Sequence, residues 1–356
     1  EIIMLKALGI VPFFAILVGC ATPSTVRFEI DRESLNAEEA IQKQLAFDKQ
    51  YDYIKRLYNI SSVILRASAS MCPGDIGKTM SFAFDDKQSF GGNWETEAYK
   101  RFGVKEYPVI TWLSPSGGAA AAGLQVGDEI IAVETTQYGN GKKARNKFLK
   151  SFDAVKQADL NTANLVIERS GEQKAVTIPL QNQCNFNVKL ESSDVENAYA
   201  DGQNIIITRG MMRFANDDKF LALVVAHELG HNVMDHMDKK KTNYALGSIF
   251  DIAAAAYGVD TRGLFGNSAA KAYSQDFEAE ADYVSLYYLK AADLPVDGVA
   301  NFWREMAAEH PGSIKTNHAA THPATSERFL AIEKAIDEIE FKESIGQSLL
   351  PDIIDK

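Results

Sequence analysis

The sequence is poor in cysteine, has no excess of positive charge and contains almost no long apolar run. Three cysteines in 356 residues are too few for a disulfide scaffold. Acidic residues outnumber basic ones by 48 to 37, and a surface with a formal net charge of −11 repels phosphate, which excludes nucleic acid as a partner. The composition is otherwise that of a globular protein, with 46% hydrophobic residues, and the length suits two domains or one domain with an insertion.

One segment is apolar enough to enter a bilayer, and it lies at the start of the sequence. Lys6 precedes an apolar core at 8–18, which is too short for an ordinary transmembrane helix but has the length of a signal-peptide core. The segment ends in Leu17-Val18-Gly19-Cys20, which resembles the lipobox of bacterial lipoproteins. A plain secretory signal or a short anchor helix is the alternative interpretation.

The lipobox resemblance implies how the mature chain begins and where it resides. Residues 1–19 would be a signal peptide, the thiol of Cys20 would be lipidated, and residues 20–33 would form a tether. Such a chain is anchored to a membrane of the bacterial cell envelope through its lipid and faces the periplasm. By the same resemblance, Ala21 after the acylated cysteine favours the outer membrane.

Lipidation of Cys20 leaves two further cysteines, Cys72 and Cys184. Because the periplasm is oxidising, these two can form a disulfide. Two free buried thiols are the alternative.

The pattern of apolar residues divides the chain into helical and strand-rich segments. A helical period runs through 34–70, and we expect residues 34–101 to form the N-terminal helical part of a larger domain. Short alternating runs with many glycines follow at 102–182 and predict a β-rich domain. Strand-like runs and then mostly helical sequence make up residues 186–345. The expected fold class is therefore α+β.

The β-rich segment contains a run that resembles a known peptide-binding domain. The run Gly123-Leu124-Gln125-Val126-Gly127-Asp128-Glu129-Ile130 resembles the core of bacterial PDZ domains, and its two glycines suit tight turns that need a positive φ. The resemblance implies an extended peptide ligand that adds to a sheet edge as a strand. We expect residues 102–108 to form the loop that binds the ligand's carboxylate. A small β-domain without a ligand is the alternative.

The motif that carries chemistry is His227-Glu228-Leu229-Gly230-His231, in an apolar helical segment. Residues four apart project from the same face of a helix, so the two imidazoles can share a cation. Glu228 lies beside the first histidine and can reach a water on that cation without being a ligand.

A third metal ligand is expected at Glu278, in the run Phe277-Glu278-Ala279-Glu280-Ala281-Asp282. Two histidines and one glutamate leave the fourth position of zinc open, which is typical of catalytic sites. Asp282 lies one turn after Glu278 and can accept the second ring N–H of a ligand histidine, His227 above all. We expect Glu280 and His236 to be solvated surface residues.

The spacing HExxH followed by ExxxD resembles the gluzincin peptidases of the HtpX, BepA, LoiP and Oma type. The resemblance covers about 186–335 and implies one Zn²⁺ per chain, bound by His227, His231 and Glu278, with Glu228 as the catalytic base. It also implies a mainly helical zincin-type domain with a small edge sheet, into which the PDZ-like domain is inserted.

The same resemblance assigns roles to further residues. One strand is expected to be the sheet edge that holds an extended substrate above the cleft: Ile205, Ile206, Ile207 and Thr208. His322 matches a histidine that caps the open metal position in relatives, and a loop histidine is the alternative. Arg328 is expected to pair with a carboxylate of the site or to steady the oxyanion. The alanine-rich segment 244–257 is expected to be a core helix.

Together these patterns predict a lipid-anchored periplasmic zinc endopeptidase that hydrolyses unfolded or misassembled envelope proteins in protein quality control. The alternative is a PDZ-bearing chaperone or assembly factor whose metal site is latched by His322 and rarely cuts. The expected partners are extended polypeptides, a peptide ligand of the PDZ-like domain and a membrane reached through the lipid.

Overall fold

The computed structural model describes residues 24–139, 142–158, 160–256, 261, 274–309 and 326–352. Cys20, with the rest of the predicted signal segment, and His322 lie outside these residues. The chain divides into two compact units, Glu1–Lys43 and Gln44–Lys356. None of the helices in the described part is long and apolar enough to cross a membrane.

In the first unit, the described residues form a short extended segment and the start of helix α1 (Arg32–Ala67). Asp31 caps this helix, because its carboxylate accepts hydrogen bonds from the backbone N–H of Ser34 at 2.9 Å and from its hydroxyl at 2.7 Å. The rest of α1 belongs to the second unit, where Phe47, Leu57 and Ile64 are buried.

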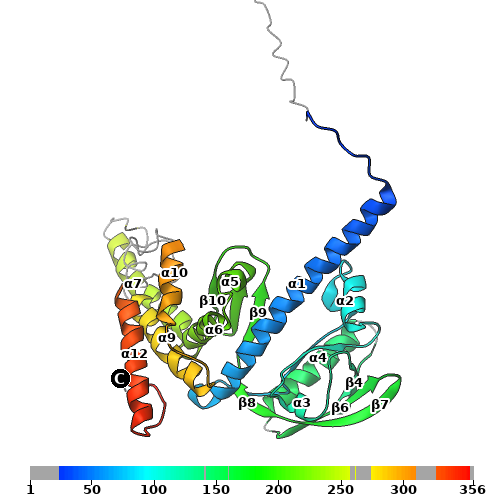
Figure 1. Cartoon of the computed structure of the whole chain (residues 1–356). Helices are drawn as coiled ribbons and strands as arrows, with labels where there is room; N and C mark the ends of the chain where they lie inside the picture. The colour runs from blue at the N-terminus through cyan, green and yellow to red at the C-terminus, as the bar shows by residue number, and fades with distance from the viewer. Residues whose placement is uncertain are drawn as a thin grey trace, which may run out of the picture. The chain divides into compact units, whose positions relative to one another are not determined.

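A six-stranded antiparallel sheet occupies the middle of the sequence (Figure 1). Its order is β2-β3-β4-β6-β7, and the short β5 pairs with β4. The strands are β2 (Phe82–Asp85), β3 (Val109–Leu113), β4 (Glu129–Val133), β5 (Thr136–Gln137), β6 (Thr162–Arg169) and β7 (Glu172–Pro179). The sheet therefore takes in a strand that precedes the expected boundary at residue 102.

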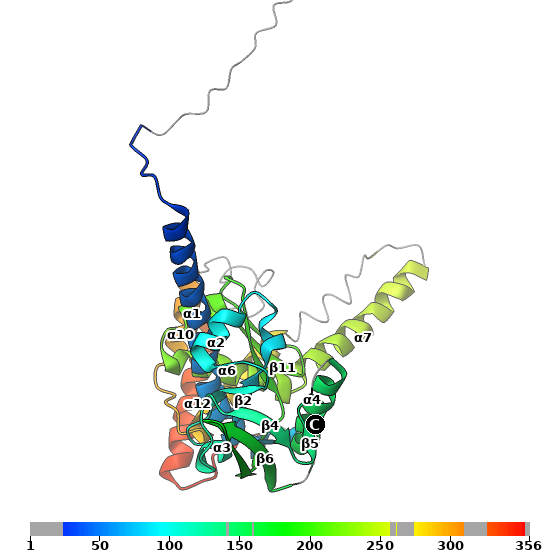
Figure 2. The same ribbon diagram turned by 90° about the vertical axis from the view of Figure 1, so that its right-hand side faces the viewer.

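Two helices and two glycine turns complete this sheet. Helix α4 (Lys142–Gln157) packs its buried Phe148 and Phe152 onto the sheet, and Figure 2 shows it beside β5; α3 (Gly118–Ala121) is the short alanine-rich helix. Gly123 has φ +81° and Gly127 has φ +97°, so the turns before β4 do require glycine's conformational freedom.

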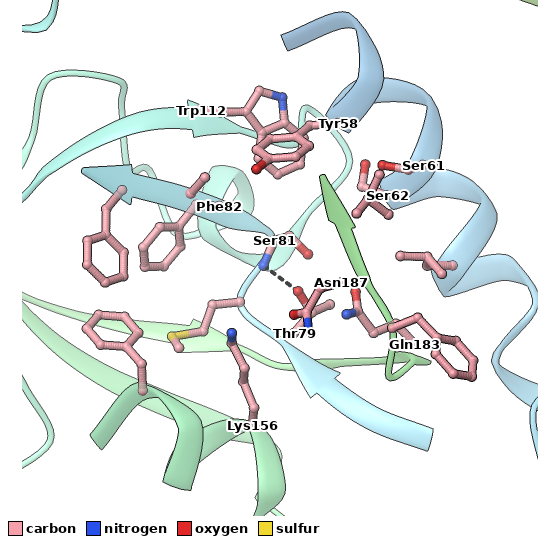
Figure 3. Close-up of a pocket in the computed structure, with 17 residues that line it drawn as sticks. Tyr58, Ser61, Ser62, Thr79, Ser81, Phe82, Trp112, Lys156, Gln183 and Asn187 are labelled. Atoms are coloured by element: carbon pink, nitrogen blue, oxygen red, sulfur yellow. Dashed lines mark hydrogen bonds between the residues drawn. The ribbon is translucent and has the colours of Figure 1, made fainter. Parts of the chain in front are cut away.

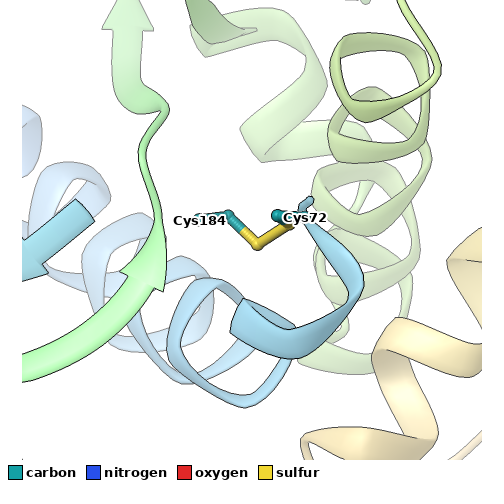
Figure 4. The surroundings of a disulfide bond; sticks show 2 residues. All are labelled: Cys72 and Cys184. Carbon is teal, nitrogen blue, oxygen red and sulfur yellow. A yellow bond between two sulfur atoms is a disulfide. The ribbon is translucent and has the colours of Figure 1, made fainter. Parts of the chain in front are cut away.

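A two-stranded ribbon closes the segment that contains the sheet. Strand β1 (Ile76–Thr79) pairs antiparallel with β8 (Gln181–Cys184), so the chain leaves and returns at one place. A disulfide joins Cys72 and Cys184 at the same place, with their Cα atoms 5.6 Å apart (Figure 4). Of the two alternatives for these cysteines, the structure has the bonded one. The bond closes a loop across a sequence separation of 112 residues, and cross-links of this length remove about 4–5 kcal/mol of unfolded-chain entropy in the loop-closure model.

A second sheet and a group of helices follow. The sheet has the order β10-β11-β9, in which β11 is antiparallel to β10 and parallel to β9. Its strands are β9 (Asn187–Glu191), β10 (Ala198–Ala200) and β11 (Asn204–Thr208). The helices are α5 (Arg209–Phe214), α6 (Asp218–Val233), α7 (His236–Ala256), α9 (Ser274–Ala291), α10 (Ala300–Glu309) and α12 (Ser326–Ser344).

The largest apolar core lies among these helices and this sheet. Leu221, Tyr287, Tyr288 and Phe302 are fully buried in it, and the buried Leu57 and Ile64 of α1 belong to the same cluster. The expectation that the N-terminal helix packs with the C-terminal helices is thus what the structure shows. The mixture of helices and mainly antiparallel sheets is consistent with the α+β class.

Candidate metal centre

Helix α6 carries both histidines of the motif and is buried along most of its length. It begins after Asp217, whose carboxylate accepts a hydrogen bond from the backbone N–H of Lys219 at 2.8 Å, and such caps stabilise a helix by about 1 kcal/mol. All residues from 221 to 232 are buried. A helix that is apolar on every side belongs in a core, so both imidazoles are held inside the protein rather than on its surface.

Gly230 allows α9 to approach α6 closely. A Cβ at this position would lie 2.9 Å from Cγ2 of Val284 and 3.2 Å from the backbone oxygen of Ala281. Backbone atoms cannot turn aside as a flexible side chain can, so any side chain here would push the helices apart. The close contact is what lets Glu278, one turn earlier on α9, reach the histidines.

The three predicted ligands converge. The Nε2 atoms of His227 and His231 are 3.1 Å apart. The carboxylate of Glu278 lies 3.3 Å from Nε2 of His227 and 3.4 Å from Nε2 of His231. One ligand atom from each residue lies within 4.8 Å of the others, and this is the one such cluster of His, Cys, Asp and Glu found among the described residues. Two imidazole nitrogens and one carboxylate oxygen fit zinc with a fourth position left open.

His227 is held on its other side by a buried ion pair. Its Nδ1 lies 2.9 Å from Asp282, as predicted from the spacing. Asp282 in turn accepts two hydrogen bonds from Arg328, at 2.7 and 2.8 Å, and the guanidinium lies over the ring of Trp303. Arg328 is 4% exposed and also lies 3.5 Å from Glu278. Of the two roles expected for Arg328, the structure shows the pairing with carboxylates.

The buried charges shift the pKa values of these groups. Burial lowers the pKa of His227, but the hydrogen bonds that its ring donates to the carboxylates of Asp282 and Glu278 outweigh burial and raise that pKa to about 9. Burial raises the pKa of Asp282, but Arg328 and His227 hold that pKa below its ordinary value. Burial lowers the pKa of His231. The pKa values of the two histidines thus shift in opposite directions: carboxylates outweigh burial at His227, and burial outweighs them at His231.

His236 is not the solvated residue that the sequence predicted, whereas Glu280 is exposed as expected. His236 is 3% exposed, with its Nδ1 2.9 Å from Nδ1 of His231 and its Nε2 2.7 Å from Glu280. The prediction was wrong because residue 236 lies five positions after His231, off the face of α6. A reversal of the chain at Asp235, whose φ is +52°, folds it back.

A cavity of about 310 Å³ opens beside the metal ligands. Glu228, 1% exposed, lines it together with His231 and Glu278. The remaining walls are partly apolar and come from β10 with the residue before it, from the start of α7 and from α9: Asn197, Tyr199, Ala200, His236, Met237, Lys240 and Phe277. The catalytic base predicted from the motif therefore faces a space large enough for part of a substrate.

The predicted edge strand is wrong. Ile205, Ile206, Ile207 and Thr208 form β11, which is the central strand of its sheet and is buried, so its backbone cannot accept a substrate strand. Strand β10 lies at the edge and lines the cavity through Tyr199 and Ala200. Pairing between distant strands decides which strand is central, and the sequence of β11 alone does not show it.

The alanine-rich helix is also not the core helix that was expected. Several large apolar side chains of α7 are exposed, with Leu246 at 56%, Ile249 at 58% and Ile252 at 71%. His322, the candidate for the fourth ligand, lies outside the described residues, so its role stays a prediction.

A second cavity, of about 300 Å³, lies along the edge strand of the six-stranded sheet (Figure 3). The segment from Thr79 to Phe84 forms one wall, and Phe152 and Lys156 of α4 form another. Figure 3 shows Lys156 rising from α4 toward the segment that holds Ser81. Ser81 has φ +62°, a left-handed conformation that is rare for serine.

The expected carboxylate-binding loop is not at this cavity. Residues 102–108 do not line it. Phe102 and Val104 are buried in a small apolar cluster with Phe47 of α1 and Phe90, and the segment leads into β3. Its apolar residues therefore support the packing of α2 (Glu95–Phe102) rather than a ligand.

Comparison with protein families agrees with the metal site that the geometry indicates. Residues 161–336 match the model of peptidase family M48, a range that includes all three ligand positions, Glu228, Asp282 and Arg328. M48 metalloproteases use zinc, which agrees with the donor set of the cluster.

The curated proteins that are similar to this chain include two metalloproteases. The mitochondrial metalloendopeptidase OMA1 of Schizosaccharomyces pombe is 28% identical over 148 residues, which are 40% of this chain and 43% of that protein. Metalloprotease LoiP of Escherichia coli is 31% identical over 152 residues, which are 40% of this chain and 59% of that protein. The chain thus spans about half the length of these relatives. Together with the family match, they support a zinc metalloprotease.

Among solved structures, the HtrA-type protease AlgW with decapeptide matches 30% of this chain and 30% of that chain, at 16% identity and a TM-score of 0.23. A likeness of that size carries no argument about the fold.

Proposed function

We propose that this protein is a zinc-dependent endopeptidase that cuts extended polypeptides. One observation carries the proposal: two imidazole nitrogens and a carboxylate converge within 4.8 Å at the wall of a cavity that Glu228 also lines. A structural metal site would be closed by a fourth protein ligand, whereas a catalytic one keeps a position free for the reactants.

The residues of the site have separate roles in peptide hydrolysis. Zinc, when bound, polarises the scissile carbonyl and lowers the pKa of the attacking water. Glu228 takes the proton from that water and passes it to the leaving amine, and it can do so because it lines the cavity without being one of the ligands. Asp282 and Arg328 hold His227 in one orientation, and the burial of all three keeps bulk water away.

Strand β10 is the element best placed to hold a substrate. It is an end strand of its sheet as described, and its residues Tyr199 and Ala200 line the cavity that Glu228 also lines. An extended peptide can add to such an edge through backbone hydrogen bonds, which depend little on sequence. This favours flexible or unfolded chains as substrates over one fixed peptide.

The second cavity, which runs along the end strand β2 and is called the groove along β2 below, is proposed as the ligand site of the PDZ-like domain. Strand β2 is the end strand of its sheet, and Phe82 and Phe152 supply apolar walls. Lys156 supplies a positive charge that suits the carboxylate at a chain terminus. The site would hold a C-terminal peptide as a strand beside β2.

We further propose that the protein works in the bacterial envelope, anchored by lipid at Cys20 and facing the periplasm, in the quality control of envelope proteins. The lipobox-like run supports the anchor, and the Cys72–Cys184 disulfide suits an oxidising compartment. Incorporation of labelled palmitate in a bacterial host tests the anchor: Cys20→Ala should abolish it, and a variant that still incorporates the label would refute the assignment.

Digestion of casein tests the enzymatic proposal. The wild-type protein should cleave it, a chelator should stop cleavage, added zinc should restore it, and Glu228→Gln should cleave nothing. A chaperone with a silent metal site is the second candidate. That alternative would be favoured if neither protein cleaves casein while both suppress aggregation of an unfolded client equally.

A further inference from the structure

The two histidines that face the metal position have different partners on their far sides. His227 has the carboxylate of Asp282, which Arg328 neutralises. The far side of His231 faces another imidazole, since its Nδ1 lies 2.9 Å from Nδ1 of His236. His236 Nε2 then lies 2.7 Å from Glu280, whose side chain is 44% exposed. A chain of three groups thus runs from His231 to the surface.

The chemistry of imidazole allows one proton arrangement along this chain when a cation is bound. Nε2 of His231 must carry a lone pair to be a ligand, so its proton sits on Nδ1 and is donated toward His236. Nδ1 of His236 must then accept, so the proton of His236 sits on Nε2. That N–H donates to the carboxylate of Glu280, which can only accept.

Each step is therefore fixed by the next, and Glu280 sets the direction of the whole chain. Without the carboxylate of Glu280 as acceptor, the tautomer of His236 that carries its proton on Nε2 is no longer favoured. The other tautomer presents an N–H to His231, and that arrangement favours the tautomer of His231 whose Nε2 is protonated and cannot bind a cation.

The fold holds His236 firmly enough for this role. Its ring is stacked on Phe277, with centroids 4.6 Å apart and planes inclined by 18°. Phe277 and Glu280 belong to α9, the helix that also supplies Glu278. The same helix therefore supplies one ligand directly and positions another.

We propose that His236 and Glu280 are positioning residues for His231, and that they set zinc affinity by fixing the tautomer and orientation of that ligand. The inference rests on the proposed function, since it takes zinc as the resident metal. Neither residue is a ligand in this account, so a preparation saturated with zinc should still hold one equivalent in every variant.

Zinc affinity, measured by competition with a chromophoric chelator, tests the proposal. His236→Leu should weaken zinc binding by about 10–100-fold, the usual effect of losing such a partner. His236→Asn should recover part of the loss, because its amide oxygen can accept where Nδ1 accepted. If the His236→Leu variant binds zinc within about twofold of the wild-type affinity, the inference is overturned, because the expected loss is at least about tenfold.

Glu280 gives a second test that does not disturb the core. Glu280→Leu should weaken zinc binding, whereas Glu280→Gln should stay close to wild type, because the amide oxygen still accepts the N–H of His236. Equal losses in both variants would show that the negative charge acts rather than the tautomer, and would overturn the inference. Asp276→Asn, an exposed acid on the same helix, is the matched control and should change nothing.

Failure of the inference can be told from failure of the proposed function. A wild-type protein that binds no zinc refutes the function. A wild-type protein with one tightly bound zinc, in which the His236 and Glu280 variants are unchanged, refutes only the positioning role.

Discussion

The metal centre and the groove along β2 are cavities of similar size, about 310 and 300 Å³, but they are built in opposite ways. The metal centre depends on charged and polar side chains that are buried and paired, drawn from α6, α9 and α12. The groove depends on the backbone edge of β2, apolar walls and one exposed lysine. Chemistry that resides in buried side chains should be lost abruptly on substitution, whereas binding that resides in a backbone edge should decline gradually.

The largest expected loss of activity is that of the Glu228→Gln variant. Glu228→Gln keeps the size of the side chain but removes the base, so the rate of casein cleavage should fall by about 10²–10⁴-fold. Zinc content should stay at one per chain, because Glu228 is not a ligand. A variant with substantial activity and full zinc content would contradict the role given to this carboxylate.

Arg328 should matter far more for stability than an arginine in a surface pair. Arg328→Ala removes the guanidinium that makes two hydrogen bonds to Asp282 and leaves this buried carboxylate paired with His227 alone among the described residues; breaking a buried ion pair in this way costs about 3–5 kcal/mol in the free energy of unfolding. The matched control is Arg304→Ala, which breaks the half-exposed pair with Glu333 and should cost about 0–1 kcal/mol. Urea unfolding of the zinc-free proteins measures both; similar losses would contradict the account of the buried pair.

The disulfide joins the two ends of the segment that contains the six-stranded sheet, and both cysteines are buried in the core that the metal-centre helices share, so it should affect the stability of both regions. Replacing Cys72 and Cys184 together by Ala should lower the unfolding free energy by about 2–5 kcal/mol. A phosphine reductant should destabilise the wild type to a similar extent and leave the double variant unaffected. If reductant destabilises both proteins equally, its effect does not come from this bond.

The smallest expected effect is at the groove. Lys156→Met should weaken binding of a peptide with a free C-terminal carboxylate by about 3–10-fold, since an exposed charge contributes only about 1 kcal/mol. The same peptide with an amidated terminus should bind wild type and variant equally. A difference between the two proteins for the amidated peptide would mean that Lys156 does not read the carboxylate.

The metal centre and the sheets also differ in how much of them could be predicted from the sequence. Helical spacing could place His227 beside His231 on one helix, and Glu278 beside Asp282 on another, because it decides which side chains share a face. That the two helices meet at one metal was implied by the family resemblance. The edge role assigned to Ile205–Thr208 failed because the order of strands depends on pairing between segments far apart, and the parallel partner β9 makes β11 central.

Two further misses have local causes. His236 could not be assigned to the site because the reversal at Asp235 breaks the helical spacing on which the prediction relied. The β-rich domain was expected to begin at 102, whereas β2 at Phe82–Asp85 already belongs to its sheet, because the pairing of this short strand with β3 cannot be read from its own sequence.

The most direct test of the central claim is the zinc content of three proteins prepared in the same way: wild type, Glu278→Ala and Asp276→Ala. The account predicts one zinc in the wild type and in Asp276→Ala, and weak or no retention in Glu278→Ala after dialysis. Full retention by Glu278→Ala would show that α9 does not supply a ligand, and the catalytic site described above would be wrong.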